Sequence, residues 1–208
     1  NTYLTLFYQR GGTLYNDTET ASGLDTPEAI ESMELYTMLY NQYGLPYQFD
    51  FANRFRSGEM PVVITDYLSY NQLTVFAPEI KGLWGMLPVP GTVREDGTVS
   101  HAAPSTVTGA ALMASAPDQK AGWEFLKWWT SAEIQSSYGR DLESVVGSAA
   151  RYNTANQEAL NSVQWDYGIK QQIKAQAAEA LAVPEAPGGY FTSRQFDFAF
   201  RNIAFYGD

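Results

Sequence analysis

One stretch, residues 57–70 (SGEMPVVITDYLSY), constrains the possible folds of this chain more than any other. A turn at Ser57–Glu59 precedes a short run of apolar and β-branched residues, Pro61–Thr65, which predicts a β-strand. We expect the strand to end at Asp66 and a helix to follow, with Tyr67 at its start. This connection would place an aromatic ring and unpaired helix N–H groups at the C-terminal edge of a sheet, where open α/β folds bind ligands.

The remaining sequence alternates predicted helices with predicted strands, which indicates an α/β fold. Two helix starts are well marked: Asp25–Glu28 combines a cap candidate with a first-turn proline, and Thr130–Glu133 forms a capping box. Asp96-Gly97 is typical of a hairpin turn. The predicted helices cover residues 25–44, 66–76, 117–129, 130 onward, 154–163, 165–182 and 190–205; the predicted strands cover 61–65, 83–89 and 108–115, with the hairpin at 92–100.

The composition excludes several classes of protein. A net charge of −10, from 23 acidic and 13 basic residues, and the absence of a Lys/Arg cluster argue against binding nucleic acid through its phosphates. No apolar run is long enough to span a membrane. The sequence contains no cysteine, so disulfides, thiolate metal sites and cysteine nucleophiles are excluded. The 14 tyrosines, 11 phenylalanines and 5 tryptophans suit both a core and a wet binding cleft.

Catalytic and metal-binding patterns are weak in this sequence. The single histidine, His101, lies in a predicted loop and has no second histidine with which to form a metal pair. The motifs of serine hydrolases, zinc proteases and P-loop NTPases are missing. Glu133, Asp141 and Glu143 could supply an acid/base pair, but their positions are more typical of solvated helix ends. The sequence therefore predicts no enzymatic activity, no metal site and no cofactor.

Several segments follow one another in an order that is known from one protein family. They are GGTLYND, DTPEAIESMELYTMLYNQYG, FRSGEMPVVITDYLSY, WGMLPVPG and TGAALMASAPDQKAGWEFLKWWTSAEIQSSYG, and the tail PEAPGGYFTSRQFDFAFRN also fits. Ala121–Lys127 and Thr130–Gln135 carry the closest match, to a helix of the form A-W-E-F-L-K-x-L-T-S-x-E-x-Q. In this order the segments resemble the family 1 extracellular solute-binding proteins, which capture substrates, mostly sugars and oligosaccharides, for bacterial ABC importers.

The resemblance implies both the fold and the domain organisation. It predicts a lobe of the type II periplasmic binding protein fold, an α/β fold with a mixed sheet flanked by helices. The abrupt start at Tyr3–Tyr8 reads as the inside of a fold, and complete members of the family have a further N-terminal segment. We therefore expect residues 1–208 to be the C-terminal portion of a two-lobed protein. Residues 1–103 and 184–208 would form mainly the second lobe, and residues 104–183 would pack partly on the first.

The same resemblance implies a ligand site after the first predicted strand. Many members carry Gly-Pro-Trp here, with the tryptophan stacked on a sugar, whereas this chain has Asp66-Tyr67-Leu68. Tyr67 would take the stacking role, because its ring can cover the apolar face of a pyranose while its hydroxyl stays available; the alternative is simple packing under the sheet edge. Asp66 either caps the next helix or accepts a hydrogen bond from the ligand, and Tyr70 would line the same cleft.

A second group of candidates follows the glycine pair Gly188-Gly189, which allows a ligand to approach the backbone closely. Tyr190 and Arg194 lie at the start of the helix predicted after these glycines. Arg194 would bind hydroxyls or a carboxylate; the alternative is a salt bridge to Asp197. The remaining candidates are Ser105 and Thr106, before the third predicted strand, and Gln9, expected on the hinge side of the cleft.

On this resemblance the predicted function is the capture of a solute outside the cytoplasm, with a mono- or oligosaccharide as the expected ligand. The two lobes would close around it by a hinge motion, and the closed form would dock on a membrane ABC permease. The protein would be lipid-anchored on a Gram-positive cell or periplasmic in a Gram-negative one. Two other classes stay open: a carbohydrate-active enzyme, which needs two facing carboxylates in a cleft, and a non-catalytic surface interaction module.

Overall fold

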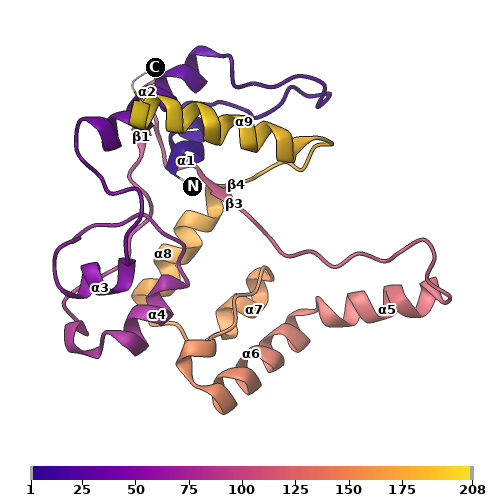
Figure 1. Cartoon of the computed structure of the whole chain (residues 1–208). Coiled ribbons are helices and arrows are strands. Elements are labelled where there is room, and N and C mark those ends of the chain that lie inside the picture. Colours follow the sequence, from indigo (N-terminus) through magenta and orange to yellow (C-terminus); the bar gives the residue numbers. More distant parts are fainter. Residues whose placement is uncertain (1, 207–208) are drawn as a thin grey trace. The chain divides into compact units, whose positions relative to one another are not determined.

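The computed structural model describes residues 2–206 and divides the chain into two compact units. Unit 1 combines residues 2–51, 88–106 and 174–206, and unit 2 combines residues 52–87 and 107–173. Each unit is therefore built from segments that are far apart in the sequence (Figure 1). None of the helices within residues 2–206 has the length and hydrophobicity of a membrane-spanning segment.

Unit 1 contains three α-helices and four short strands, and its strands pair in two separate ladders. The antiparallel pair is the predicted hairpin, with Thr92 opposite Ser100, and the prediction of a turn at Asp96-Gly97 is confirmed. The parallel pair joins two segments that flank residues 107–173 of unit 2 in the sequence, with Pro104 opposite Leu181. The elements are α1 (Thr2–Gln9), α2 (Pro27–Asn41), β1 (Thr92–Val93), β2 (Val99–Ser100), β3 (Ala103–Ser105), β4 (Ala180–Ala182), α9 (Gly189–Arg201) and the π-helical turn η3 (Asn202–Tyr206).

The core of unit 1 is centred on α1, whose aromatic residues are almost completely buried. Phe7 is 0% exposed, and its ring stacks on the rings of Tyr3 and Tyr8, with centroids at 5.7 and 6.2 Å. Leu4, Ala29 and Ala102 complete the buried cluster. A Cβ atom at Gly12 would collide with the Phe7 ring, so the loop after α1 closes directly over this ring.

Unit 2 is mostly helical, and its core lies around Trp165. Leu160, Val163 and Ile173 are buried with Trp165 in one cluster. α8 begins in unit 2 and carries the chain into unit 1. The elements are α3 (Phe51–Arg56), α4 (Ser69–Phe76), the 3₁₀ turn η1 (Pro78–Ile80), α5 (Gln119–Trp129), α6 (Ala132–Val146), the 3₁₀ turn η2 (Ser148–Ala150), α7 (Gln157–Ser162) and α8 (Tyr167–Ala178).

Side-chain caps explain why the helix predictions are confirmed where the start signals are strong. Thr26 accepts a hydrogen bond from the Ala29 N–H, and Ser131 accepts one from the Ile134 N–H. Asp118 caps α5 in the same way. The prediction for 165–182 is too long, because the chain leaves the helix after Ala178 to pair as β4. The helix predicted from residue 66 begins only at Ser69.

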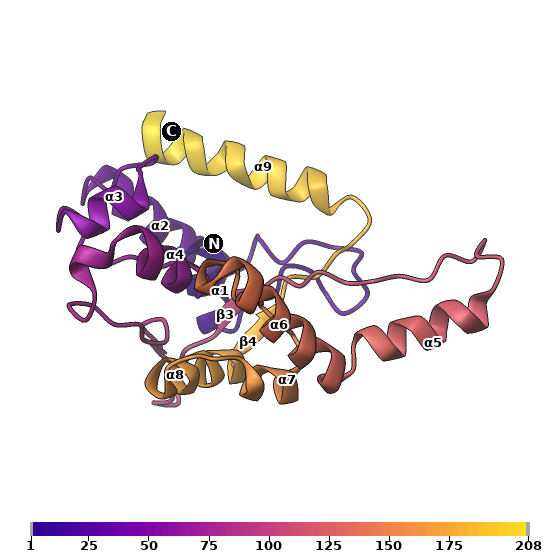
Figure 2. The same ribbon diagram turned by 90° about the horizontal axis from the view of Figure 1, so that it is seen from below.

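The three strands predicted outside the hairpin are wrong. Residues 61–65, 83–89 and 108–115, all within the described part of the chain, contain no strand. A strand needs a neighbour to pair its N–H and C=O groups, and within residues 2–206 none of these segments has one. Their apolar residues therefore stay exposed: Val62 and Leu83 are each 80% exposed. Figure 2 shows the segment around 107–118 as an extended connection that leads into α5.

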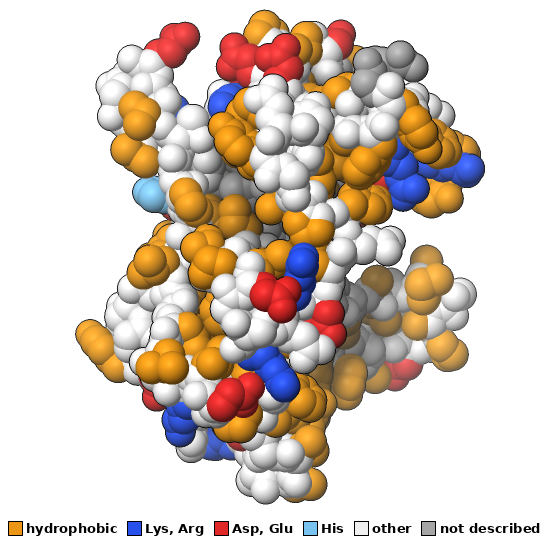
Figure 3. Space-filling view, turned by 60° about the vertical axis from the view of Figure 1, so that its left-hand side comes forward, with side chains coloured by type: hydrophobic (Ala, Val, Ile, Leu, Met, Phe, Trp, Pro, Cys, Tyr) orange, Lys and Arg blue, Asp and Glu red, His pale blue; other side chains and the backbone are white. Residues whose placement is uncertain are grey.

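The surface of the molecule carries many exposed hydrophobic side chains, and Figure 3 shows them spread over one of its faces. On α5, Trp123, Phe125 and Trp128 are each more than half exposed, and the helix has no buried residue. The amphipathic pattern that predicts this helix is therefore present, but the apolar side of the helix stays largely exposed within residues 2–206.

Buried tyrosines are expected to make the protein lose stability at high pH. Burial raises the pKa of Tyr3 from 10.0 to about 12, and burial, together with the charge of Asp66, raises the pKa of Tyr67 to about 12. Between pH 10 and about 12 the folded chain keeps protons that the unfolded chain releases, so the free energy of unfolding should fall as pH rises. Denaturant titrations that follow tyrosinate absorbance across this window measure the effect, and a flat profile would contradict it.

Candidate ligand-binding site

An aromatic cluster in unit 2 surrounds the residues predicted to bind ligand. The ring centroids of Tyr67 and Tyr70 lie 5.8 and 5.6 Å from the ring of Trp165, both edge-on, and Trp84 lies 5.1 Å from Tyr70. The Arg151 guanidinium lies over Trp165 at 5.0 Å. We refer to these five residues as the Trp165 cluster. The structure thus places Tyr67 and Tyr70 against the same tryptophan. The expectation that both line one ligand cleft stays a prediction.

Asp66 shapes the turn that carries Tyr67 into this cluster. Its Oδ1 accepts a hydrogen bond of 3.0 Å from the Leu68 N–H, and its backbone carbonyl accepts one of 3.2 Å from the Ser69 N–H. The Asp66 side chain therefore holds a local turn before α4, but it does not cap this helix, whose N-cap is Leu68 without a side-chain hydrogen bond. Asp66 is exposed, so its second carboxylate oxygen is accessible from outside.

Polar contacts fix the other members of the cluster. The Tyr70 hydroxyl donates to Asp166 Oδ2 at 2.8 Å. Arg151 makes a salt bridge of 2.7 Å to Glu143, and its Nε also donates to the same carboxylate. Both side chains of this pair are largely buried, so the charge over Trp165 is held in place and compensated. Tyr67, half-buried and with its pKa raised to about 12, keeps a neutral hydroxyl at physiological pH.

In unit 1, Gln9 is buried, and both polar atoms of its carboxamide form hydrogen bonds with other residues of the chain. Its Nε2 donates to the Pro90 carbonyl at 2.8 Å, and its Oε1 accepts from Thr92 Oγ1 at 2.7 Å. Arg94 Nε donates to the Gln9 backbone carbonyl. Gln9 thereby ties the end of α1 to the loop that leads into β1. Its predicted role in ligand binding stays a prediction, and the contacts of its carboxamide are structural ones.

The remaining predicted residues of unit 1 lie on the surface. Tyr190 is 70% exposed in the first turn of α9, which Gly188 precedes in a left-handed conformation with φ of +85°. Arg194 lies over Phe198 at 5.4 Å, whereas Asp197, its alternative partner, pairs with Arg201 at 2.9 Å. Ser105 ends β3, and Thr106 follows it. Within unit 1 these groups are accessible to solvent, and their binding roles stay predictions.

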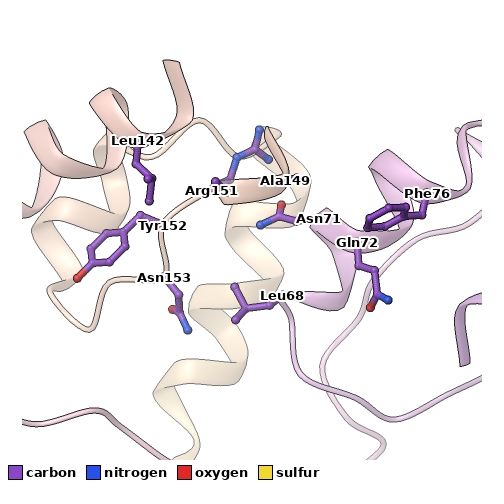
Figure 4. Close-up of a pocket in the computed structure, with 10 residues that line it drawn as sticks. Leu68, Asn71, Gln72, Phe76, Leu142, Ala149, Arg151, Tyr152 and Asn153 are labelled. Carbon is purple, nitrogen blue, oxygen red and sulfur yellow. The ribbon is translucent and has the colours of Figure 1, made fainter. Parts of the chain in front are cut away.

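Unit 2 also contains a cavity of about 400 Å³ that the sequence does not predict (Figure 4). One wall comes from α4, and the opposite wall comes from the end of α6 and the segment that begins with η2. No residue pattern marks these walls in advance, because they meet only in the folded unit. The lining residues are Leu68, Asn71, Gln72, Phe76, Leu142, Ala149, Ala150, Arg151, Tyr152 and Asn153.

The groups considered for catalysis or metal binding are engaged elsewhere or dispersed. Among residues 2–206, no three His, Asp or Glu side chains come close enough to hold a metal ion. The Nδ1 atom of His101 lies 2.8 Å from the Val89 carbonyl, and the His101 backbone N–H donates to Glu179. Glu143 is committed to Arg151.

Comparison with known proteins shows what the chain is similar to. The family model of the bacterial extracellular solute-binding proteins matches residues 1–136, more than half of the chain. No curated protein matches closely enough to count as a relative. Among solved structures, an ABC transporter solute-binding protein from Thermotoga lettingae TMO, bound with α-D-tagatose, has 17% identity and a TM-score of 0.65 over 98% of this chain. The sugar-binding protein MalE from Xanthomonas citri has 13% identity and a TM-score of 0.71 over 100% of it.

The chain spans about half the length of these two proteins, 50% of the first and 51% of the second. At these identities the likeness establishes the fold, and it confirms the predicted class, that of the periplasmic binding proteins. The mixed sheet expected from that class is represented in residues 2–206 by one antiparallel and one parallel pair of strands.

Proposed function

The chain belongs to the bacterial extracellular solute-binding proteins, and on this premise we propose that the protein captures a carbohydrate outside the cytoplasm. One observation supports this ligand class more than any other: Tyr67 lies against Trp165 directly after the Asp66 turn, beside Tyr70. Aromatic rings with polar tips match a sugar, which has apolar C–H faces and hydroxyl edges. Both solved neighbours described above are named for a sugar ligand or for sugar binding.

The proposed chemistry is recognition without a covalent step. Tyr67 supplies a ring face and a neutral hydroxyl, and Asp66 offers a carboxylate oxygen that accepts hydrogen bonds from sugar hydroxyls. The net charge of −10 does not oppose the binding of a neutral solute. Arg194, Tyr190, Ser105 and Thr106, which all lie in unit 1, are further proposed ligand contacts.

The proposal includes a partner and a mode of action. Closure of two lobes around the solute by a hinge motion would bury the ligand, and the closed form would dock on an ABC permease. Residues 1–103 and 184–208 would belong mainly to the second lobe, and residues 104–183 would pack partly on the first. The uncovered aromatic face of α5, with Trp123, Phe125 and Trp128, supports such a packing role. The protein would be lipid-anchored or periplasmic.

Replacing Tyr67 tests the proposed ligand class. In titration calorimetry of the full-length protein with mono- and oligosaccharides, Tyr67→Ala should weaken binding about tenfold, because the stacking surface is lost. Tyr67→Phe keeps the ring and should lose less. Tyr43→Ala, which removes a tyrosine that is 71% exposed in unit 1, is the matched control and should bind like the wild type.

Two results would overturn this assignment. If the wild type and Tyr67→Ala bind sugar with the same affinity, Tyr67 is not part of the binding site. If the wild-type protein binds none of the sugars, or hydrolyses them, the proposed function itself is wrong. Thermal melting of each variant shows whether a change in affinity comes from lost folding instead.

A further inference from the structure

The charged member of the Trp165 cluster, Arg151, is held by an ion pair with Glu143 that is largely buried. Arg151 Nη2 donates to Glu143 Oε1 at 2.7 Å, and its Nε lies 3.2 and 3.3 Å from the two carboxylate oxygens. The two side chains are only 13% and 19% exposed. Burying two charges costs solvation free energy that their attraction does not always recover, so stability alone does not explain this pair.

Within residues 2–206, no hydrogen bond fixes the orientation of the Trp165 ring. Its Nε1 atom is buried without a partner, although a buried indole N–H usually finds an acceptor. The Arg151 guanidinium lies over the ring instead, 5.0 Å from the centroid, where the negative π face attracts a cation. The rings of Tyr67 and Tyr70 meet the same indole edge-on. A rotation of the Trp165 ring would therefore displace both tyrosines.

The charge of Arg151 also acts on Tyr70 directly. Burial and the hydrogen bond to Asp166 raise the pKa of Tyr70, and the positive charge of Arg151 opposes this rise. The Tyr70 hydroxyl is itself fixed on Asp166 at 2.8 Å. Arg151 thus interacts with two members of the aromatic cluster, while its own position is set by Glu143.

We propose that Arg151 is a positioning residue of the ligand site, held by Glu143 so that its guanidinium fixes the plane of the Trp165 ring. Through that ring it sets the places of Tyr67 and Tyr70. This role rests on the proposed function, because Tyr67 is the ring that stacks on the carbohydrate. Arg151 touches no solute in this assignment. Loss of its charge should therefore weaken carbohydrate binding in a protein that stays folded.

The double variant that combines Glu143→Gln with Arg151→Met separates positioning from a structural role. Neither charge is left buried without its partner, so the melting temperature should stay close to that of the wild type. The affinity for sugars should nevertheless fall about tenfold in calorimetry of the full-length protein. A purely structural pair would leave the affinity of such a stable variant unchanged. Arg151→Lys keeps a cation over the ring and should lose less than about threefold; an equal loss in both variants would contradict the role of the charge.

NMR of the Trp165 ring gives a second readout, which a purely structural pair would not move. The indole Nε1–H signal is assigned by its absence in Trp165→Phe. In the double variant this signal should broaden or split, because the ring then takes more than one orientation. A shift of one sharp signal would report only the lost charge. Arg151→Lys should keep a single signal.

A matched control and a panel of methyl glycosides, free monosaccharides and disaccharides distinguish the possible failures. The control combines Glu133→Gln with Arg140→Met, the same two changes at exposed positions of α6, and should bind like the wild type. If the neutral pair does not fold, Arg151→Gln replaces it with the same expected loss of affinity, since glutamine keeps a donor for Glu143. Wild-type affinity in these variants, or a single sharp Trp165 signal, overturns the role of Arg151 alone. A wild type that binds no sugar of the panel overturns the proposed function and this role together.

Discussion

Phe7→Ala is expected to lower the free energy of unfolding of unit 1 by about 3 to 5 kcal/mol. The ring is 0% exposed and lies between the rings of Tyr3 and Tyr8. Removal of the ring leaves a cavity that α1 cannot close by moving. The helix is anchored by the Tyr8 hydroxyl on the Ala182 carbonyl, and by Gln9 on Pro90. The neighbouring loop is also fixed, since Gly12 already lies against the Phe7 ring.

Denaturant unfolding of the full-length protein measures this loss. Phe7→Leu, which refills most of the volume, should lose clearly less than alanine. Phe191→Ala is the matched control, because this ring is 67% exposed in the same unit and contacts mainly Tyr190; its effect should stay within about 1 kcal/mol. If Phe7→Ala costs no more than Phe191→Ala, α1 is not the centre of the unit 1 core.

The parts of the fold that depend on local sequence could be predicted, and the parts that depend on distant partners could not. The start of α2 could be predicted because the Thr26 side chain accepts a hydrogen bond from the backbone N–H of Ala29, three residues further on. The hairpin could be predicted because Asp96-Gly97 forms its turn. Pro61–Thr65 has the composition of a strand, but a ladder requires a second segment, and residues 2–206 provide none beside it. Within the described residues, the only parallel pair joins residues 103–105 to residues 180–182, and the sequence predicts a helix for the second of these segments.

The candidate site shows the same division. The sequence marks Tyr67 because it follows a turn and begins a helix, and the structure places it against a tryptophan almost a hundred positions away in the chain. Trp165 itself carries no signal of its role, since a tryptophan at the start of a predicted helix is most often a core residue.

Trp165→Ala is expected to destabilise unit 2 by about 3 to 5 kcal/mol and to weaken carbohydrate binding as strongly as Tyr67→Ala. Trp165 is only 6% exposed and packs with Leu160, Val163 and Ile173, so its loss opens the middle of this core. It also removes the surface that orients Tyr67.

The loss of affinity in Trp165→Ala should therefore be larger than the unfolded fraction of the variant alone would cause. Calorimetry at a temperature where the variant is still folded separates the two effects, with circular dichroism as the check. Trp165→Phe keeps a ring under Tyr67 and removes an indole N–H that is buried without a partner. Its cost should remain below about 1.5 kcal/mol, and it should retain most of the affinity, because the lost N–H makes no bond. Tyr167→Ala, at a tyrosine of unit 2 that is 80% exposed on α8, is the matched control for stability and for affinity. Equal losses of stability in Trp165→Ala and Tyr167→Ala would show that the Trp165 cluster does not support unit 2, and equal affinities would show that it does not position Tyr67 for a ligand.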